Sequence, residues 1–403
     1  MSNNLELSLI VALLAGKLDL AQQFSTNPEL NWSLLYKLVV RHRVCHQIYA
    51  GLSNQKNLSP SSADQLLTNS LAHFYTRLAQ FCYQDRLHLL ATAAETVRIG
   101  REFSHKQLLH CFIKGIPLNL HIYGELTSRP CRDIDVWVEL ADFALARELL
   151  LGLGYQQRLP TYELSGFKAD YYFKHKHDMA FYHPKRKVLV ELHFRLSYFG
   201  IDFFALRPEL LQTVNVLNTP IYTLKDDYLL LYLMLHAAIH AWSRLRWLND
   251  IALYLQARKC DLNQVYALAE QLSAEHIVLQ ALTLVRDILE VEINDGAKCS
   301  AELALPVSSL KAGQSLAKIA KQYIDADYEV SAGYGVFHKL FFVYRYYLAK
   351  LAVKGQKFNA LVGDLVKIDM LFPYVTLPNK CGWLYYLLYP LWVVKYIFAP
   401  KGN

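Results

Sequence analysis

Cysteine is scarce in this sequence, and its distribution excludes two kinds of small-domain scaffold. The seven cysteines are scattered and odd in number, and no two of them form a C-x-x-C pair. This distribution argues against a disulfide framework and against a zinc site built from paired ligands. It is typical of a reducing compartment, so we expect a cytoplasmic protein.

Segments that direct a chain to a membrane are also lacking. Residues 1–16, MSNNLELSLIVALLAG, contain Glu6 and no basic residue, a composition that does not fit a secretion signal. The apolar segment 382–398 is shorter than the roughly 20 residues that a spanning helix needs, and Pro390 and Lys395 interrupt it. We therefore expect no transmembrane span. A docked terminal helix pair is favoured for 382–398, and peripheral membrane contact is the alternative.

Charge of either sign is modest, and hydrophobic residues are plentiful. Of the 403 residues, 19% are charged and 53% are hydrophobic, which suffices for one large core or two to three smaller ones and argues against disorder. The formal net charge of +7 suits a nucleotide, a nucleic acid or an acidic membrane surface, but it does not choose among them. The chain has no internal repeat and no low-complexity tract.

Hydrophobic periodicity divides the chain into three regions. Helical spacing dominates residues 1–107, where a long helix is expected from about Ser61 to Phe103. Residues 108–200 change to strand-like patterns and form the expected α/β core, and residues 201–403 return to helical patterns. The predicted fold is α+β and mostly helical, with a small mixed-sheet core flanked by N-terminal and C-terminal helical lobes.

Turn residues separate the shorter elements within and after the middle region. The expected elements are a strand and a short helix in 110–124, a strand at 133–140, a helix at 142–151, two paired strands in 170–196 around a turn at 183–187, and a helix capped by Thr223 and Asp226 as a pair.

Three carboxylates lie on matching faces of the predicted strands. Side chains alternate along a strand, so Asp133 and Asp135 share one face while Ile134 and Val136 fill the other. Glu191 lies on the last strand of the core. If the two strands are neighbours, the three carboxylates converge into an all-oxygen site suited to one or two Mg²⁺ ions that also hold substrate phosphates. A D-x-D pair by itself is more often a solvated strand edge.

Groups that suit phosphate accompany these carboxylates. The glycine of the Lys114-Gly115 turn lets backbone N–H groups and the start of a helix approach a phosphate closely. Taken singly, a Lys-Gly pair is mostly a turn, and a lone histidine in a strand is more often structural. The candidate nucleotide-binding residues of this region are Lys114, Gly115, Arg129, Arg132, His193 and Arg195.

A helix is predicted at about 226–257 with a polar and aromatic stripe on its otherwise apolar surface. The stripe consists of His236, His240, Arg244 and Trp247. It either packs against the α/β core through hydrogen bonds or lies over the nucleotide or the acceptor. A zinc site of His236, His240 and Asp250 is a weaker alternative, because Asp250 lies ten residues beyond the second histidine.

Two further stretches combine charge with histidine or aromatic residues. His175, His177 and Asp178 lie in KHKHD, a pattern that is usually a solvated strand edge. Residues 337–357, FHKLFFVYRYYLAKLAVKGQK, could bind RNA or acidic lipid. The default interpretation is a helix face whose lysine and arginine stems cover apolar surface.

The order of these motifs resembles a known family. The matching stretches are FIKGIPLNLHIYGELTSRPCRDIDVWVEL, GLGY, VLVELHFRL and YLMLHAAIHAWSRLRWLNDIALYL, with the lead-in LNWSLLYKLVVRHRVCHQIYAGL and the closing LPNKCGWLYYLLYPLWVVKYI. Together they resemble the uncharacterised nucleotidyltransferases, a branch of the DNA polymerase β-like nucleotidyltransferase superfamily, over nearly the whole chain.

The resemblance implies an enzyme that moves an NMP from an NTP to an acceptor hydroxyl, releases pyrophosphate and depends on Mg²⁺, with Mn²⁺ as the alternative. It implies that Lys114-Gly115 form the phosphate turn. It also implies that Asp133 and Asp135 bind metal, and that Glu191 is the third carboxylate and helps to activate the acceptor. ATP is favoured, and the acceptor is a small molecule, a protein or RNA. The sequence departs from the superfamily in the lysine of the turn and in having Glu where Asp is more usual.

Two other classes of protein stay open. A catalytically silent nucleotide-binding or scaffold protein would keep the fold without turnover, although three carboxylates on matching faces argue against it. Metal-dependent glycosyltransferases also use D-x-D, but they usually carry a larger nucleotide-binding sheet before the motif, where this chain is predicted to be helical.

Overall fold

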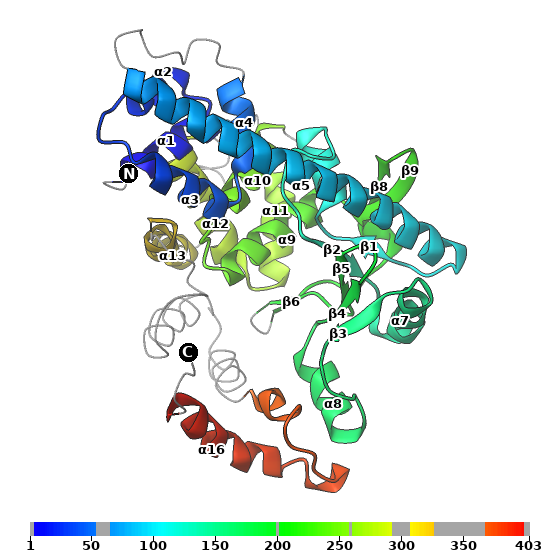
Figure 1. Ribbon diagram of the computed structural model, residues 1–403. Coiled ribbons are helices and arrows are strands. Elements are labelled where there is room, and N and C mark those ends of the chain that lie inside the picture. Colours follow the sequence, from blue (N-terminus) through cyan, green and yellow to red (C-terminus); the bar gives the residue numbers. More distant parts are fainter. Residues whose placement is uncertain are drawn as a thin grey trace.

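The computed structural model describes residues 4–53, 65–198, 201–257, 260–291, 307–325 and 367–398. These residues form helices packed around one small mixed sheet, which confirms the predicted α+β, mostly helical fold class. In Figure 1 the N-terminal helices lie together with α9, α10 and α12, and the sheet lies beside this helical group. The basic and aromatic stretch 337–357 lies outside the described residues.

The N-terminal helices begin and end at residues that suit these positions. They are α1 (Leu5–Leu14), α2 (Leu18–Ser25), α3 (Trp32–His42) and α4 (Cys45–Ser53). The side chain of Asn31 accepts a hydrogen bond from the N–H of Leu34 at 3.0 Å and so caps α3. This helix ends at Arg43, whose backbone is left-handed with a φ of 55°.

The helix α5 (Gln65–His105) connects the N-terminal helices to the sheet (Figure 1). It packs against α3 and α4, and also against β2, β5, α7 and β9. The prediction of a long helix is confirmed. Its expected start at Ser61 lies outside the described residues, and its end is at His105 rather than Phe103.

The sheet has five strands in the order β1-β2-β5-β4-β3. They are β1 (Cys111–Phe112), β2 (Asp133–Trp137), β3 (Gln156–Leu159), β4 (Asp178–His183) and β5 (Val188–His193). The central pair, β2 and β5, is parallel, and all other neighbours are antiparallel. Ile134, Val136 and Val190 fill the apolar face beneath α5.

The helices between the strands agree with the prediction in two places and correct it in one. The connecting elements are α6 (Ile116–Leu118), η1 (Asn119–Tyr123), η2 (Leu140–Asp142), α7 (Phe143–Gly152) and α8 (Gly166–His175). The short helix after the Lys-Gly turn and the helix near 142–151 are confirmed. The prediction of a strand from 170 is wrong, because residues up to His175 belong to α8. Its Phe167 and Tyr171 pack four residues apart against Phe372 from a distant part of the chain.

A hairpin precedes the C-terminal helices, and the sequence analysis did not anticipate it. The elements here are β6 (Ser197–Tyr198), β7 (Ile201–Asp202), η3 (Pro208–Leu210), β8 (Leu211–Val216) and β9 (Thr219–Leu224). Leu217 and Asn218 both have positive φ, which matches the twist of a two-residue hairpin turn. The predicted capping role of Thr223 is wrong, because Thr223 is buried in β9 and Lys225 stands at the start of the next helix.

The predicted helix at 226–257 is two helices, α9 (Asp226–Ile239) and α10 (Leu245–Gln256). Ala241 and Trp242 lie between them with φ values of 51° and 57°, a left-handed conformation that side chains with a Cβ rarely adopt. Trp242 is fully buried, so the burial of a large aromatic side chain offsets the backbone strain. The prediction of one continuous helix is therefore wrong. The break was not predicted because the apolar pattern continues through this corner.

The last described elements complete the helical part. They are α11 (Leu262–Gln271), α12 (Glu275–Leu289), α13 (Val307–Asp325), η4 (Ile368–Leu371), η5 (Asn379–Cys381) and α16 (Leu384–Phe398). Exposed apolar residues line one side of α16 at Leu387, Leu391 and Val394, with Trp383 just before the helix. Within the described part of the chain, no helix is long and apolar enough to cross a membrane.

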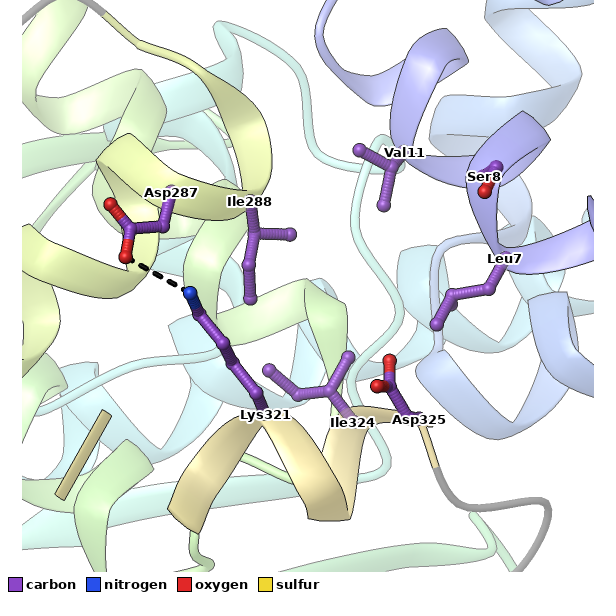
Figure 2. Close-up of a pocket in the computed structure, with 8 residues that line it drawn as sticks. All are labelled: Leu7, Ser8, Val11, Asp287, Ile288, Lys321, Ile324 and Asp325. Carbon is purple, nitrogen blue, oxygen red and sulfur yellow. Dashed lines mark hydrogen bonds and ion pairs between the residues drawn. The ribbon is translucent and has the colours of Figure 1, made fainter. Parts of the chain in front are cut away.

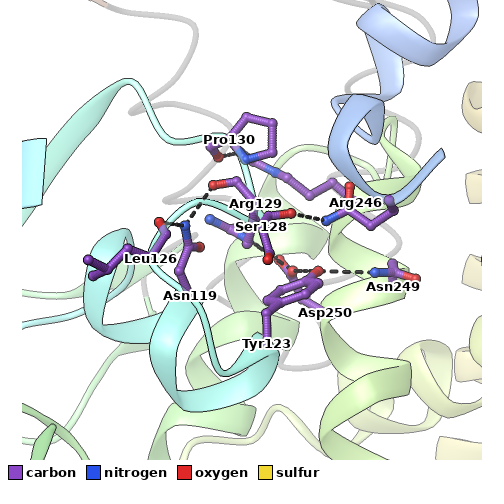
Figure 3. Close-up of polar contacts among 10 residues, drawn as sticks. Asn119, Tyr123, Leu126, Ser128, Arg129, Pro130, Arg246, Asn249 and Asp250 are labelled. Carbon is purple, nitrogen blue, oxygen red and sulfur yellow. Dashed lines mark hydrogen bonds and ion pairs between the residues drawn. The ribbon is translucent and has the colours of Figure 1, made fainter. Parts of the chain in front are cut away.

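A buried polar network ties the loop before β2 to α10 (Figure 3). The Nε of Arg129 lies 2.9 Å from both carboxylate oxygens of Asp250, and these side chains are only 3% and 1% exposed. The hydroxyl of Tyr123 donates to Asp250 at 2.8 Å, and Asn249 donates to that hydroxyl at 3.0 Å. Asn119 donates to two carbonyl groups of the loop. The network fixes the chain segment that leads into the strand of the two aspartates.

Replacing Asp250 with Ala leaves the buried guanidinium of Arg129 without its carboxylate. We expect the free energy of unfolding to fall by about 3–5 kcal/mol, because breaking one side of a buried ion pair strands the other charge. Asp287→Ala is the control, since it removes a partly exposed pair with Arg286 and Lys321 and should cost about 1 kcal/mol or less. Urea denaturation measures both, and equal losses would contradict the assignment.

Candidate active site

A cavity of about 390 Å³ lies between the sheet and the helices α9 and α10. Its walls differ in charge. The acidic wall contains Asp133, Asp178 and Glu191, with Lys114 beside them, and the cationic wall contains Arg43, Arg129, Arg244 and Arg246. The remaining lining residues are Gly115, Cys131, His177, His193, Tyr232, His236, Ile239, His240 and Trp247.

The acidic wall is set by the parallel pairing of β2 with β5. In this register Asp135 lies directly beside Glu191, and Asp133 lies beside Leu189. The two strands are therefore neighbours, which is the condition on which the predicted convergence of the carboxylates depended. Asp133 and Glu191 line the cavity, whereas the side chain of Asp135 is fully buried behind them.

Asp135 has two cationic neighbours on one oxygen and none on the other. Its Oδ1 lies 3.0 Å from the Nζ of Lys114 and 3.3 Å from the Nε2 of His193. Burial alone would raise the pKa of this carboxyl, but the charge of Lys114 and the hydrogen bond from His193 reverse the effect and lower it. Its Oδ2 is buried and has no hydrogen-bond partner among the residues that the structure describes. A buried carboxylate oxygen in this state is suited to accept a cation.

The pKa of Glu191 reflects the repulsion among these neighbouring acids. Burial, followed by the charges of Asp135 and Asp133, raises the pKa of Glu191 to about 8. His193 lies 3.9 Å from Glu191 and acts in the opposite direction. The carboxylates therefore repel one another strongly, and positive charge added between them would relieve this repulsion.

The donor set fits a divalent ion. Asp135, Glu191 and His193 each offer a ligand atom, and these three atoms lie within 4.8 Å of one another. Two carboxylates suit Mg²⁺, and a histidine nitrogen beside them is compatible with Mn²⁺. When bound, such an ion neutralises carboxylates and phosphate oxygens together. Asp133 is outside this group of three but faces the same cavity.

Gly115 forms the floor of the cavity. Its φ of 73° and ψ of −128° define a conformation that is readily adopted only by glycine. It lies against residues 131–133, because an added Cβ would be 3.7 Å from the carbonyl oxygen of Asp133. The helical segment of α6 and η1 starts immediately after it, and the first N–H groups of a helix lack intrahelical acceptors. These features place the start of this helical segment beside the strand residue Asp133.

Arg246 is the part of the cationic wall that the sequence analysis missed most clearly. Arg246 is 7% exposed, and its Nη1 donates to the carbonyl of Pro130 at 2.9 Å. Within the described part of the chain, its buried Nε has no hydrogen-bond partner. Burial and the charges of Arg129 and Arg43 hold the pKa of Arg246 well below its usual range. This wall of the cavity therefore has an excess of positive charge, which favours an anionic ligand.

His236 and its neighbours complete the wall opposite the sheet. Burial and the charge of Lys114 hold the pKa of His236 well below its ordinary value, so the imidazole is neutral. His240 stacks on Trp247 with ring centroids 5.0 Å apart, and the guanidinium of Arg244 lies 5.4 Å from the same ring. The predicted stripe is therefore divided between α9, the corner and α10, yet all four of its side chains line the cavity.

Several predicted residues lie elsewhere. Arg132 is exposed and does not line the cavity, and Arg195 donates to the carbonyl of Lys174. Asp250 is engaged by Arg129 and Tyr123 rather than by His236 and His240.

Other lining residues gave no clear signal in the sequence. His177 and Asp178, whose pattern favoured a solvated edge, line the cavity, and the ring of His177 stacks on His193. Arg43 comes from the end of α3, far from the core in sequence, and no local pattern marks it.

A second cavity of about 200 Å³ lies between α1, α12 and α13 (Figure 2). Apolar side chains such as Leu7, Val11 and Ile288 form much of its lining, and its ion pair joins Lys321 to Asp287 at 2.9 Å. Its charged lining residues are Asp287, Lys321 and Asp325. Among the described residues, charged side chains and histidines are more numerous in the cavity between the sheet and α9–α10.

The fold and the site define an α+β protein with clustered carboxylates beside a glycine turn and a cationic wall, an arrangement suited to a metal ion and phosphates. The sequence pattern of the uncharacterised nucleotidyltransferase family matches residues 28–290. The chain belongs to this family. No curated protein matches the chain.

One solved structure is similar in part. It is the crystal structure of an antigenic nucleotidyltransferase-like protein from Paracoccidioides brasiliensis, with 14% identity and a TM-score of 0.31. The similarity covers 51% of this chain and 94% of that one. At this TM-score the family assignment rests on the sequence match.

The cationic wall predicts that inorganic pyrophosphate binds in the cavity. Arg246→Met keeps an apolar stem and removes the charge, so we expect pyrophosphate affinity to fall roughly tenfold or more, because a hydrogen bond to a charged group contributes about 1.5–3 kcal/mol. Arg158→Met, at an exposed position of β3, is the matched control. Calorimetric titration measures both variants. Unchanged affinity in Arg246→Met would place the anion elsewhere.

Proposed function

We propose that this protein is a metal-dependent nucleotidyltransferase that moves an NMP from an NTP to an acceptor hydroxyl and releases pyrophosphate. The observation that carries the proposal is the register of β2 and β5, which sets the buried Asp135 beside Glu191, a lining residue of a cavity whose other wall is cationic. Nucleotidyl transfer needs positioning and charge neutralisation more than covalent protein chemistry. Both walls together supply these two requirements.

In this proposal Asp133, Asp135 and Glu191 hold Mg²⁺ or Mn²⁺, and the ion supplies neutralisation of the phosphate oxygens in the transition state. His193 supports the arrangement through its hydrogen bond to Asp135. Family membership supports a nucleotide substrate. ATP is our favoured nucleotide, and a small molecule, a protein and RNA all stay candidates for the acceptor.

The phosphates would lie between the Gly115 turn and the cationic wall. The backbone N–H groups of Ile116 and Leu118 would donate to phosphate oxygens, and Arg129 and Arg246 face the same space. Arg129 is held in place by Asp250, so this guanidinium is already ordered before a ligand arrives. Preorganised donors of this kind lower the cost of binding. His236, His240 and Arg244 face the remaining volume, where base, sugar or acceptor would lie.

The chemical step begins with the acceptor hydroxyl. Its proton passes to the carboxylate of Glu191, and its oxygen forms a bond to the α-phosphorus of the NTP. The bond from the α-phosphorus to the oxygen that bridges to the β-phosphorus breaks, and pyrophosphate leaves with that oxygen. Burial beside Asp135 and Asp133 raises the pKa of Glu191 to about 8 while the site holds no metal ion. A cation beside this carboxylate would lower the pKa, so that Glu191 is ionised and accepts the proton.

The alternatives receive less support. A D-x-D glycosyltransferase would usually have a larger sheet before the motif, and here β2 is preceded, among the described residues, by helices and the short strand β1. A silent nucleotide-binding protein has the same fold and differs only in turnover.

Asp133→Asn and Asp135→Asn test the proposal. We expect one NTP to bind the wild type in the presence of Mg²⁺, and each substitution to reduce transfer by at least about a hundredfold, because several kcal/mol of charge neutralisation is lost. Calorimetry with the four NTPs, with and without Mg²⁺, measures binding. Transfer is followed with α-³²P-labelled NTP and a panel of acceptors.

The matched control is Asp19→Asn, an exposed carboxylate of α2, which should behave as the wild type. Circular dichroism verifies that each variant folds. Retained transfer in either site variant would rule out the proposed site. Metal-dependent NTP binding without any transferred label would favour the silent binding protein.

A separate proposal concerns 382–398, where we infer peripheral contact with a membrane surface. Trp383, Leu387, Leu391 and Val394 are 59%, 61%, 68% and 55% exposed and follow spacings of four, four and three, so they form one apolar stripe. Exposed apolar side chains on one side of a helix favour binding to a membrane surface, because the strength of this binding increases with the apolar area that is buried. Co-sedimentation with anionic lipid vesicles should fall in Leu387→Gln/Leu391→Gln. Equal co-sedimentation of wild type and variant with the vesicles would contradict this proposal.

A further inference from the structure

Lys114 places a positive charge inside the acidic cluster. Its Nζ lies 3.0 Å from the Oδ1 of Asp135, and its side chain is only 15% exposed. The carboxylate of Asp135 at this distance favours the charged form of Lys114. Asp133 and Glu191 line the same cavity as Lys114.

The position of this ammonium overlaps with the candidate metal centre. Asp135 belongs to the group whose ligand atoms lie within 4.8 Å of one another, together with Glu191 and His193. The same carboxylate is the partner of Lys114. A divalent ion in this group and the ammonium of Lys114 would both lie beside Asp135. Two positive charges that contact the same buried carboxylate repel each other strongly.

We propose that Lys114 is a built-in counter-ion that holds the carboxylates together and competes with a free divalent ion for Asp135. This inference rests on the proposed function, because it concerns the metal centre of the same site. It assigns to the lysine of the turn a role in setting metal affinity. The ion is then bound weakly by itself and well only when Lys114 has another anionic partner.

The structure provides Lys114 with the means to change partner. A lysine carries its charge on a flexible four-carbon stem, and Lys114 lines the cavity next to Gly115. A phosphate at the Gly115 turn would offer the ammonium a second anion within reach of that stem. Metal and nucleotide would thereby help each other to bind, and such coupling is reciprocal by thermodynamic necessity.

Lys114→Met tests the proposal without any nucleotide. Methionine keeps an unbranched apolar stem and removes the competing charge, so we expect Mn²⁺ to bind on the order of tenfold more tightly than in the wild type, comparable to the effect of a nearby charge on ionisation. Lys185→Met is the matched control on the exposed β4–β5 turn and should bind Mn²⁺ as the wild type does. Calorimetry and the electron paramagnetic resonance signal of free Mn²⁺ give the affinity.

Unfolding temperature supplies a second readout. Without Lys114 the carboxylates repel one another, so Lys114→Met should unfold at a lower temperature in EDTA and gain more from Mn²⁺ than the wild type. Lys114→Gln is a second neutral variant in case methionine prevents folding. Lys114→Arg keeps the charge and should show no gain in Mn²⁺ affinity.

Equal or weaker Mn²⁺ binding in the neutral variants overturns the proposal, as does a complete lack of Mn²⁺ binding in every form of the protein. A gain in Lys114→Arg equal to that in Lys114→Met also overturns it, because the effect would then not depend on charge. These outcomes are independent of turnover. Transfer by the wild type with unchanged affinity in the neutral variants would refute the counter-ion and leave the nucleotidyltransferase intact.

Discussion

Parallel pairing of β2 with β5 is the constraint on which the candidate site depends. In this register neighbouring strands present their side chains at the same height, so Asp135 stands beside Glu191 rather than one step away. A shift of one residue would turn every side chain of one strand to the opposite face of the sheet. The repulsion that the pairing creates is visible in the raised pKa of Glu191, and it is balanced by Lys114 and His193.

Residues that belong to periodic elements could be predicted from the sequence. The alternation around Asp133 and Asp135 gave the strand and its polar face, and the Lys-Gly pair gave the turn, because both signals are contained in a few adjacent residues. The division into a small mixed sheet and surrounding helices followed from the change of period. The alternation did not indicate which strand would pair with β2, because pairing between strands 50 residues apart depends on the whole fold.

The errors have a common physical origin in contacts between distant parts of the chain. The strand predicted from 170 is helical because Tyr171 packs against Phe372. The corner at Ala241 and Trp242 interrupts an apolar pattern that continues through it, and the burial of Trp242 stabilises a backbone that local preference disfavours. Arg43 and Arg246 are ordinary surface residues by sequence. They become part of the cavity only because α3 ends and α10 begins beside it.

The helix α5 has a consequence for how the molecule unfolds. Phe74 and Leu78 belong to the hydrophobic core of the helical part, whereas Leu89, Val97 and Phe103 belong to the core beneath the sheet. One continuous helix thus contributes side chains to two cores, and its hydrogen-bond ladder passes between them without a loop. Melting of either core exposes part of the same helix and weakens the other. The sheet and the helical part are therefore coupled into one cooperative unit, although the chain looks divisible by sequence.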